Sequence, residues 1–278
     1  MALHYTTISF LSDLGLTDES VGIVRSIIRT ISPEVTTIDI THGITPHDVR
    51  AGSLCLARAV QYVAPGVVLA VIDPTVGTAR RAVAVEVGNG AGVLVGPDNG
   101  LLASAVAMTG GATRAVELTN ADFHLAAIGR TFSCRDVFGP VAAHLCNGVA
   151  LTSLGAEIDP LTLTPGLMPL ARTEPGALIT EVLWVDSYGN AQLNIGPEDL
   201  DHLTNGDSTT RLRLDFAAGG RVGFRMASIA DTFANITSSD AGLVTDSYGL
   251  VSICLNQRSV SNELGIHVGT EITLSALA

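Results

Sequence analysis

The sequence predicts an α/β fold in two parts: an N-terminal α/β domain with a mostly parallel sheet, and a smaller C-terminal β domain. Up to residue 146, apolar runs of strand length alternate with helical patterns, as they do in βαβ units. Residues 161–169 are punctuated by Pro and Gly, as linkers are, and short β-rich runs follow them. We therefore expect domains at residues 1–164 and 177–278, joined by a linker at 165–176. The strand-like runs of the second domain fit either a sandwich or a barrel.

The elements follow from the period of the apolar residues. Five runs have the length and character of buried strands: 7–11, 35–40, 67–72, 82–87 and 92–95. Four stretches have helical patterns: 20–31, 49–62, 101–109 and 136–146. The β-rich runs of the second domain are 177–185, 191–195, 211–215, 221–225, 249–255 and 271–274.

The chain has 278 residues, enough for one large α/β domain or two domains. Hydrophobic residues make up 47% and charged residues 15%, yet no apolar run reaches the roughly 18 residues that a membrane span needs. Residues 1–11 lack the basic start of a signal peptide. The sequence therefore predicts no membrane partner, and we expect a cytoplasmic location.

Charge and residue usage exclude several kinds of chemistry. The formal net charge of −12 disfavours nucleic acid as a partner. All 15 basic residues are arginine, so the chain has no Schiff-base lysine and no Walker-type phosphate lysine. The four cysteines show no C-x-x-C pairing and no clustering with histidine, which argues against zinc and for reduced thiols: Cys55, Cys134, Cys146 and Cys254.

The apolar run 67–72 ends in a turn that carries one acid and two arginines. Pro74 cannot continue a central strand, and Gly77 gives the backbone freedom. Asp73 should therefore stand at the carboxyl end of the sheet, with Arg80 folded back towards it. Open α/β sheets bind their ligands at this edge. The alternative is a structural turn with a surface ion pair.

Two further turns of the first domain carry polar side chains. Asp13 follows the first strand and is placed to bind the two hydroxyls of a ribose, whereas Asp18 is better explained as a cap of the next helix. Residues 131–140 form a polar cluster that opens a helix, whose N-terminus could bind electron-rich groups. There we expect Asp136 to pair with Arg135 or to cap the turn.

The second domain holds an acid, an aromatic and an amide in one turn: Asp186, Tyr188 and Asn190. A hairpin alone would explain Gly189-Asn190, but an exposed aromatic beside an amide also suits a purine. A fourth group comprises Ser247-Tyr248-Gly249, Leu255-Asn256-Gln257 and Phe233. Taken singly, each of these segments is better explained as structure.

Taken together and in order, the segments resemble the S-adenosylmethionine hydrolases, hydroxide adenosyltransferases related to the fluorinating and chlorinating enzymes. The resemblance covers about residues 8–273. It rests on S-D-x-G-x-x-D from Ser12, D-I-T-H-G-I-T-P-H-D-V at 39–49, D-P-x-V-G-T-x-R-R at 73–81 and G-P-D-N-G-L-L at 96–102. It implies an N-terminal α/β domain, a C-terminal β-barrel-like domain and a homotrimer with adenosyl sites at subunit contacts.

The same resemblance implies substrate-binding roles. Asp13 would hold the ribose hydroxyls. Positions that match contacts to the methionine end are Asp18, Ser20, Asp186 and Ser247. Adenine would be held by Tyr188, Asn190, Phe233, Leu255, Asn256 and Gln257. Phe132 and Cys134, which flank Ser133, are counted with the substrate-binding residues.

Asp73 separates the hydrolases from the halogenases. In this resemblance the hydrolases have aspartate at the position and the halogenases have tyrosine. The fluorinating enzymes also carry a long insertion after this region, and the chain runs from Arg81 to Gly96 without one. Both features favour water as the nucleophile.

One position departs from the family pattern. The hydrolases read F-H-G-R-D, whereas residues 132–136 read F-S-C-R-D, so Ser133 replaces the histidine. A serine hydroxyl can position water but is a poor base at neutral pH. His124 is the nearest other histidine, and it is better explained as a surface or core residue.

The expected reaction is attack of water at C5′ of S-adenosylmethionine, which gives adenosine and methionine. Asp73 would accept the proton, Arg80 would fix that carboxylate, and Ser133 would contact the water. Methionine leaves as a neutral thioether, and no metal or redox cofactor is implied. The alternatives are a non-catalytic protein that binds adenosine or S-adenosylmethionine, which the missing histidine supports, and a halide-using synthase of 5′-halo-5′-deoxyadenosine. An unrelated α/β hydrolase is disfavoured because the G-x-S-x-G motif is missing.

Overall fold

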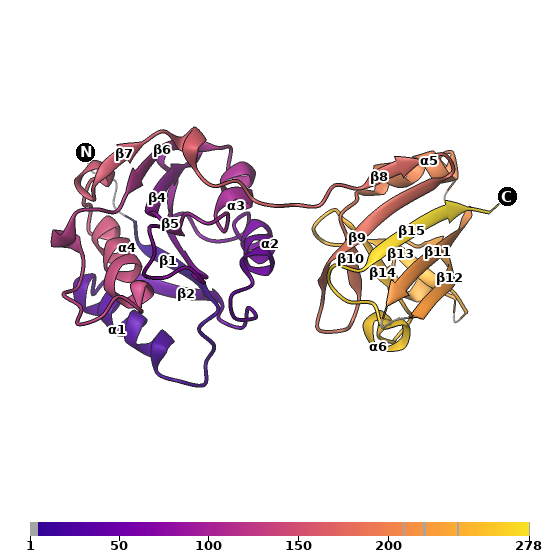
Figure 1. Ribbon diagram of the computed structural model, residues 1–278, viewed down its shortest axis with the longest axis horizontal. Coiled ribbons are helices and arrows are strands. Elements are labelled where there is room, and N and C mark those ends of the chain that lie inside the picture. The colour runs from indigo at the N-terminus through magenta and orange to yellow at the C-terminus, as the bar shows by residue number, and fades with distance from the viewer. Residues whose placement is uncertain (1–4, 208, 219–220, 238, 278) are drawn as a thin grey trace. The chain divides into compact units, whose positions relative to one another are not determined.

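The computed structural model describes residues 5–207, 209–218, 221–237 and 239–277. The chain divides into two compact units, residues 1–167 and 168–278 (Figure 1). The division falls within the stretch predicted as a linker, residues 165–176. Part of that stretch is ordered as a short strand, β8 (Arg172–Glu174), which pairs with the next strand of the second unit.

The first unit contains a seven-stranded sheet in the order β2-β1-β3-β5-β4-β6-β7. Strands β2, β1, β3 and β5 are parallel; β4 is antiparallel to β5 and β6, and β7 is antiparallel to β6. The predicted mostly parallel sheet is therefore confirmed. The strands are β1 (Thr7–Ser12), β2 (Thr36–Thr41), β3 (Val67–Val71), β4 (Ala82–Val87), β5 (Gly92–Pro97), β6 (Ala112–Glu117) and β7 (Ala156–Ile158).

Helices cover both faces of this sheet, which explains why strand β3 is apolar and buried along its whole length. Helices α1 (Ser20–Ile31) and α4 (Gly139–Cys146) pack on one face, where Ile8 and Phe10 belong to the same buried cluster. Helices α2 (Val49–Ala59) and α3 (Ala103–Met108) pack on the other, with Leu11 and Ile72. Figure 1 shows the two helix pairs on either side of the strands. The short helices of this unit are η1 (Gly88–Gly90), η2 (Ala121–Phe123), η3 (Cys134–Phe138), η4 (Leu151–Ser153) and η5 (Pro160–Thr162).

The order of strands reverses beside β1. The chain passes from β1 to β2 on one side and returns to β3 on the other, with Ser12 opposite Val71 in the parallel register of β1 and β3. Open α/β sheets bind ligands at the carboxyl ends of strands where the order reverses. Asp13 and Asp73 follow these two strands, so the topology brings both carboxylates to that edge.

The second unit is a closed β-barrel of seven strands. They follow each other around the barrel as β9-β10-β14-β13-β12-β11-β15, and the pairing of β10 with β9 closes the ring. The barrel-like domain is therefore confirmed, and the sandwich alternative is wrong. The bounds are β9 (Ala177–Val185), β10 (Ala191–Leu193), β11 (Arg211–Ala218), β12 (Arg221–Ile229), β13 (Ala241–Thr245), β14 (Val251–Cys254) and β15 (Glu271–Ala276). The helices are η6 (Pro197–Leu200), α5 (Asp201–Thr204), η7 (Phe233–Asn235) and α6 (Val260–Leu264).

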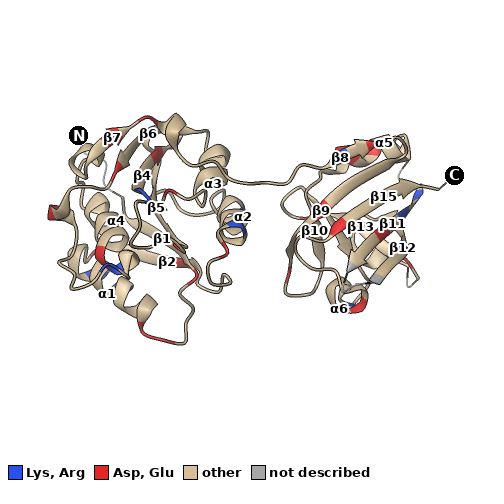
Figure 2. Ribbon diagram, in the orientation of Figure 1, with Lys and Arg blue, Asp and Glu red and all other residues tan. Residues whose placement is uncertain are grey.

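Acidic residues are distributed over the described parts of both units, as Figure 2 shows. No single element gathers them. Within the described part of the chain, every helix is too short or too polar to cross a lipid bilayer.

Candidate active site

Asp73 lies two residues beyond β3 and forms a buried ion pair with Arg80. The Asp73 side chain is 5% exposed and that of Arg80 is 11% exposed. Arg80 Nε donates to Asp73 Oδ1 at 3.0 Å, and Arg80 Nη2 donates to Asp73 Oδ2. The guanidinium therefore forms a bidentate pair with both carboxylate oxygens, the arrangement in which arginine binds a carboxylate most specifically. The surface ion pair of the structural alternative is not what this turn forms.

Two hydroxyl groups add to the hydrogen bonding of the Asp73 carboxylate. Ser133 Oγ donates to Oδ2 at 3.1 Å, and Thr75 Oγ1 donates to Oδ1 at 3.3 Å. The structure therefore brings together all three residues that the sequence proposed as catalytic. Thr75 was missed, although a hydroxyl two residues after a turn aspartate is a common partner of that carboxylate.

Ser133 immediately precedes η3, a π-helix over Cys134–Phe138 that runs directly into α4. The predicted helix at 136–146 therefore starts two residues earlier and begins with a π turn. Such turns are rare and often lie at functional sites. Phe138 is fully buried, and the Arg80 guanidinium carbon lies 5.3 Å from the centre of its ring. One helical segment therefore contacts the carboxylate through Ser133 and supports the guanidinium through Phe138.

Cys134 directly follows Ser133 and is buried. Burial raises the pKa of its thiol, and the negative charges of Asp13 and Asp73 raise that pKa further. The thiol is therefore protonated at neutral pH and is no nucleophile.

Phe132 packs against the core of the first unit, and the Arg135 guanidinium lies 5.1 Å from its ring centre. Arg135 pairs with Asp136, with Nε donating to Oδ1 at 2.6 Å. This is the structural pairing that the sequence predicted for Asp136.

Asp13 is fixed by the loop that follows β2. The backbone N–H of His47 donates to Asp13 Oδ2 at 2.8 Å, and Gly15 N donates to the carbonyl of His42 at 2.8 Å. His47 has a φ of 70°, an uncommon conformation for a residue other than glycine. The sequence reasoning missed both contacts, although it singled out residues 39–49 as a motif.

Two buried side chains, Ser12 and His42, lie beside the same loop, with the more exposed Asp39 next to them. Ser12 Oγ lies 2.8 Å from His42 Nδ1, and His42 Nε2 lies 3.1 Å from Asp39 Oδ1. The order resembles a Ser-His-Asp triad, but Ser12 is fully buried and its Oγ also accepts the N–H of Leu14 at 3.3 Å. The hydroxyl therefore holds the turn and cannot reach a substrate.

Asp18 and Ser20 lie at the start of α1. Asp18 Oδ1 accepts the backbone N–H of Ser20 at 2.9 Å, and Asp18 itself is exposed. This bond satisfies a free N–H of the first helical turn, as a capping residue does. The N-cap position itself is Glu19, which makes no side-chain capping bond, so Asp18 contacts the helix start from one residue before the cap.

The second unit contains a cavity of about 670 Å³. Its lining includes every residue proposed for adenine, together with Asp186: Tyr188, Asn190, Phe233, Leu255, Asn256 and Gln257. Tyr188 is 80% exposed and Phe233 is 52% exposed, so two aromatic rings stand at a hollow that is large enough for a nucleobase. The structure thus brings together residues that are up to 71 positions apart, from Asp186 to Gln257.

Asp186 organises the turn that carries Tyr188. Its Oδ1 accepts the backbone N–H groups of Tyr188 at 2.9 Å and Asn190 at 2.8 Å, while its Oδ2 accepts Asn190 Nδ2 at 2.8 Å. The carboxylate therefore fixes both the backbone of the turn and the orientation of the Asn190 amide.

Ser247 lies in a second turn of the same sequence, D-S-Y-G. Asp246 Oδ1 accepts the N–H groups of Tyr248 at 2.8 Å and Leu250 at 3.2 Å, just as Asp186 does in the first turn. The first turn precedes β10 and the second precedes β14, and these strands are antiparallel neighbours. The two turns therefore lie at opposite ends of this strand pair. Ser247 does not line the cavity that contains Tyr188.

Among the described residues, His124 is not one of the hydrogen-bond partners of Asp73. Burial lowers its pKa, and within the described part of the chain its Nε2 is buried without a hydrogen-bond partner. Among the described residues, the side chains that contact Asp73 are Arg80, Thr75 and Ser133. The described residues also contain no group of three or more His, Cys, Asp or Glu side chains that could hold a metal ion.

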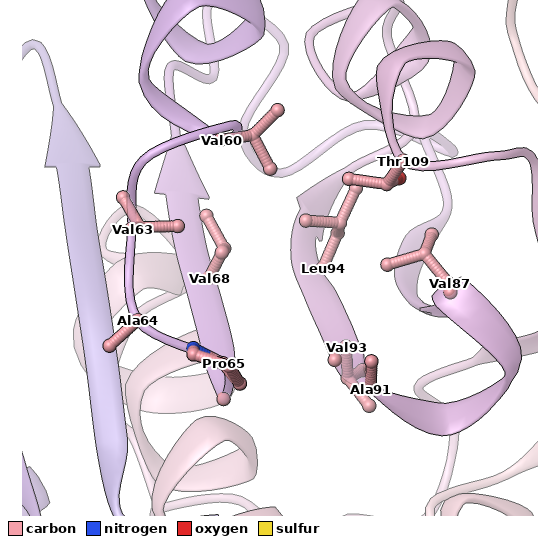
Figure 3. A pocket seen from close by; sticks show the side chains of 13 residues that line it. Val60, Val63, Ala64, Pro65, Val68, Val87, Ala91, Val93, Leu94 and Thr109 are labelled. Atoms are coloured by element: carbon pink, nitrogen blue, oxygen red, sulfur yellow. The ribbon is translucent and has the colours of Figure 1, made fainter.

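A different cavity of the first unit, of about 260 Å³, lies at the amino-terminal ends of β3 and β5. Figure 3 shows Val60, Val68 and Leu94 around it. Its lining carries no charged side chain among the described residues. It lies at the opposite end of β3 from Asp73 and does not suit a charged nucleoside.

Comparison with known proteins agrees with this arrangement. Residues 8–155 match the SAM hydroxide adenosyltransferase N-terminal domain, and residues 180–273 match the C-terminal domain of the same family. The chain is 39% identical to an (R)-S-adenosyl-L-methionine hydrolase of Salinispora tropica over 97% of each chain. It is 36% identical to the protein of that name from Thermus thermophilus, over 95% of this chain and 98% of that one.

More distant and structural relatives extend the comparison. A fluorinase of an Actinoplanes species is 28% identical over 96% of this chain and 97% of its own. The crystal structure of an uncharacterized conserved protein from Thermotoga maritima superposes with a TM-score of 0.85 at 31% identity, covering 96% of this chain and 99% of that one. With both domain matches in sequence order and full-length relatives above 30% identity, the chain belongs to the SAM hydroxide adenosyltransferase family.

Proposed function

We propose that this protein hydrolyses S-adenosyl-L-methionine to adenosine and L-methionine, by attack of water at C5′. The observation that carries the proposal is the Asp73 carboxylate, which Arg80 and Ser133 hold at the carboxyl end of β3. The names of the relatives that match over nearly the full chain support the same reaction.

The reaction needs a positioned water and an acceptor for one proton. A lone pair of the water oxygen forms the new C5′–O bond as the C5′–S bond breaks, and the bonding pair stays on sulfur. Methionine thus leaves as a neutral thioether and needs no acid. The oxygen loses one proton, which we assign to Asp73 before it passes to solvent. Holding the water in line with the C5′–S bond can supply on the order of 7 to 11 kcal/mol of the barrier at best.

Arg80 and Ser133 have distinct parts in this proposal. Arg80 fixes the plane of the carboxylate, because it binds both oxygens. Ser133 Oγ, at Oδ2, is the hydroxyl that would contact the attacking water. Serine is too weak a base to take the proton itself, which leaves that step to the carboxylate.

The charge of the site suits a sulfonium cation. Asp13 and Asp73 follow the paired strands β1 and β3 at this edge, and only Arg80 pairs with Asp73 among the described basic residues. A cationic substrate is therefore attracted to this edge of the sheet. Hydrolysis removes the positive charge from sulfur, so this attraction does not hold the methionine product.

We assign the adenine to the cavity of the second unit. Tyr188 and Phe233 offer aromatic faces for stacking. The Asn190 amide, which Asp186 orients, carries one acceptor oxygen and a second N–H, the pair that reads the edge of adenine. Asp13 is assigned to the ribose hydroxyls, and Asp18, Ser20, Asp186 and Ser247 to the methionine end, as the family resemblance implies.

Two finer features also belong to the proposal. The printed names of the hydrolase relatives specify the (R) form, so we propose the (R) epimer at sulfur as the preferred substrate. We also propose a cytoplasmic homotrimer with its substrate sites at subunit contacts. Light scattering of the purified protein measures the oligomer directly.

The test is incubation with separated (R) and (S) epimers of S-adenosylmethionine in water enriched in ¹⁸O. We expect adenosine and methionine from the (R) epimer, with the label in the 5′-hydroxyl, and release of one proton per turnover in weakly buffered solution. Binding of S-adenosylmethionine without any product would support the alternative of a non-catalytic binding protein. Adenosine without the ¹⁸O label would rule out attack of water at C5′.

A further inference from the structure

We propose that Asn99 is a positioning residue for the Asp73–Arg80 pair, and that residues 96–102 hold both partners of that pair in place. The inference rests on the proposed function, because it concerns the geometry of the proposed base. Residues 96–102 (G-P-D-N-G-L-L) belong to the motifs of the resemblance, but none of the roles assigned above uses them.

The first contact reaches the carboxylate through its own backbone. Asn99 Nδ2 donates to the carbonyl of Ile72 at 2.9 Å, and Asn99 Oδ1 accepts the N–H of Leu101 at 3.2 Å. The parallel pairing of β3 with β5 extends only to Leu69 and Val95. Beyond that point the Asn99 side chain connects the two segments, one peptide before Asp73. It therefore fixes the direction in which the chain leaves the sheet.

The second contact reaches the guanidinium. Arg80 Nη1 donates to the carbonyl of Arg81 at 3.1 Å, and Asp98 N donates to the same carbonyl at 3.0 Å. Arg81 Nε donates to Asp98 Oδ2 at 2.9 Å. Asp98 therefore holds Arg81 through backbone and side chain, and the carbonyl of Arg81 orients Arg80.

Two glycines let residues 96–102 come close enough to make these contacts. A Cβ on Gly96 would lie 2.2 Å from the carbonyl oxygen of Ala70, so only glycine allows β5 this close to β3 at that point. Gly100 has a φ of 93°, which glycine adopts without strain. Residues 96–102 thus hold the Asp73–Arg80 pair in place, and the distance from that pair to the reacting atoms sets the rate of the proposed hydrolysis.

The chain offers a matched control for Asn99. Asn120 makes the same two bonds elsewhere in the first unit: its Nδ2 donates to the carbonyl of Ser153 at 2.9 Å, and its Oδ1 accepts the N–H of Asp122 at 3.1 Å. A change of Asn120 to alanine removes equal hydrogen bonding without touching Asp73 or Arg80. If Asn99→Ala lowers kcat more than Asn120→Ala does, the difference is due to the location of Asn99 beside the Asp73–Arg80 pair.

The experiment measures kcat and KM for S-adenosylmethionine, and the thermal unfolding midpoint, of the wild type, Asn99→Ala and Asn120→Ala. We expect Asn99→Ala to lower kcat by roughly 10- to 100-fold with KM nearly unchanged, because a misplacement on the order of 1 Å can cost about 10²-fold. Asn120→Ala should lower the unfolding midpoint and leave kcat close to the wild type. Equal kcat values for the two variants would overturn the proposal.

Two further variants keep the test decisive if Asn99→Ala does not fold. Asn99→Asp preserves the size and the bond from Leu101 but places an oxygen against the carbonyl of Ile72. We expect a reduced kcat and an acidic limb of the kcat–pH profile that moves to higher pH, because added negative charge favours protonation nearby. Asn99→Ser removes the bond to Ile72 without adding charge, so it should lower kcat and leave that limb in place. A wild type that releases no adenosine contradicts the proposed function; an active wild type with unaffected Asn99 variants contradicts only this inference.

Discussion

Ser133 Oγ and Asp73 Oδ2 lie 3.1 Å apart although 60 positions separate the two residues in the chain. The contact exists because the start of the π-helix η3 packs against the end of β3 in the folded domain, so that the first helical turn faces the carboxylate. It places a hydroxyl, rather than an imidazole, at the proposed water site. In the proposed reaction, the proton therefore goes to Asp73.

Asp73→Asn should keep the shape of the site and lower kcat by roughly 10²- to 10⁴-fold, the usual loss for a general base. The amide oxygen can still accept a hydrogen bond from Arg80, so S-adenosylmethionine should still bind in calorimetry, with a weaker affinity because one negative charge near the sulfonium is lost. Asp240→Asn is the control, because Asp240 is also buried and also pairs with an arginine, Arg211. Near-native turnover by Asp73→Asn would mean that the water is activated elsewhere.

Ser133→Ala should cost less than Asp73→Asn, because it removes one hydrogen bond to the carboxylate and one water contact but leaves the base. Ser133→His should keep or raise the rate by restoring a second polar anchor. Steady-state kinetics of both variants checks this order, with Ser53→Ala as a serine control, whose side chain bonds to Ser104 among the described residues. A loss from Ser133→Ala as large as that from Asp73→Asn would contradict the assigned roles.

Halide should be a poor nucleophile for this enzyme. An anion beside an ionised Asp73 meets like-charge repulsion, which the buried setting of that carboxylate screens weakly. The assay adds chloride or fluoride together with an enzyme that removes methionine, and compares 5′-halo-5′-deoxyadenosine with adenosine by chromatography. More halogenated product than adenosine would reverse the assignment of water as nucleophile.

Tyr188→Ala should raise KM by removing an aromatic face from the cavity of the second unit, by about 10-fold if stacking contributes roughly 1 to 1.5 kcal/mol. The value of kcat should change little, because the reacting atoms are elsewhere. Tyr62→Ala serves as the control, since Tyr62 is similarly exposed at 75% and lies in the first unit. An unchanged KM would exclude Tyr188 from adenine binding.

His42 should make the fold sensitive to acid. Burial lowers its pKa from 6.5 to about 4, and the nearby charge of Arg25, which itself pairs with Asp39, adds to this effect. The imidazole is neutral in the folded protein between these values but protonated in the unfolded chain. The unfolded state therefore binds more protons there, and stability is fully present above pH 6.5 and falls as the pH drops towards 4.

The loss amounts to about 3 kcal/mol at most, given a shift from 6.5 to about 4. Urea unfolding at several pH values measures it. His42→Gln should flatten the slope between pH 6.5 and 4, whereas His202→Gln, at an exposed position, should not. Equal slopes in the wild type and His42→Gln would assign the acid sensitivity to other groups.

The sequence predicted the central elements of the fold because their signals are local. The run 67–72 is apolar throughout, as a strand buried on both faces must be, and α1 was placed at its observed bounds by the period of its apolar residues. Two of the missed strands, β6 and β8, lack such a signal. Strand β6 begins Ala-Thr-Arg and exposes two of its first three residues, and β8 is exposed throughout. These short strands form because a neighbouring strand offers a partner, which a local pattern does not reveal.

The contacts of the candidate site also divide into those with a local sequence signal and those without one. Asp73 and Arg80 could be paired from the sequence because Pro74 and Gly77 force a turn between them. The contact of Asn99 with Ile72 and that of His47 with Asp13 use backbone groups brought near by the sheet topology. No residue type marks such a backbone contact in advance, so it becomes visible only when the strands are in place.

The twin D-S-Y-G turns bear on how motifs are transferred between relatives. Asp186 and Asp246 impose the same hydrogen-bonded loop, so the tetrapeptide encodes a backbone shape and nothing more. The first copy borders the cavity because residues 255–259 lie against it; Gly189 is so close to Ser259 that a Cβ would come within 2.0 Å of the hydroxyl. A search that aligned the second copy in place of the first would transfer the role proposed for Tyr188 to Tyr248, which lies at the other end of the β10–β14 strand pair.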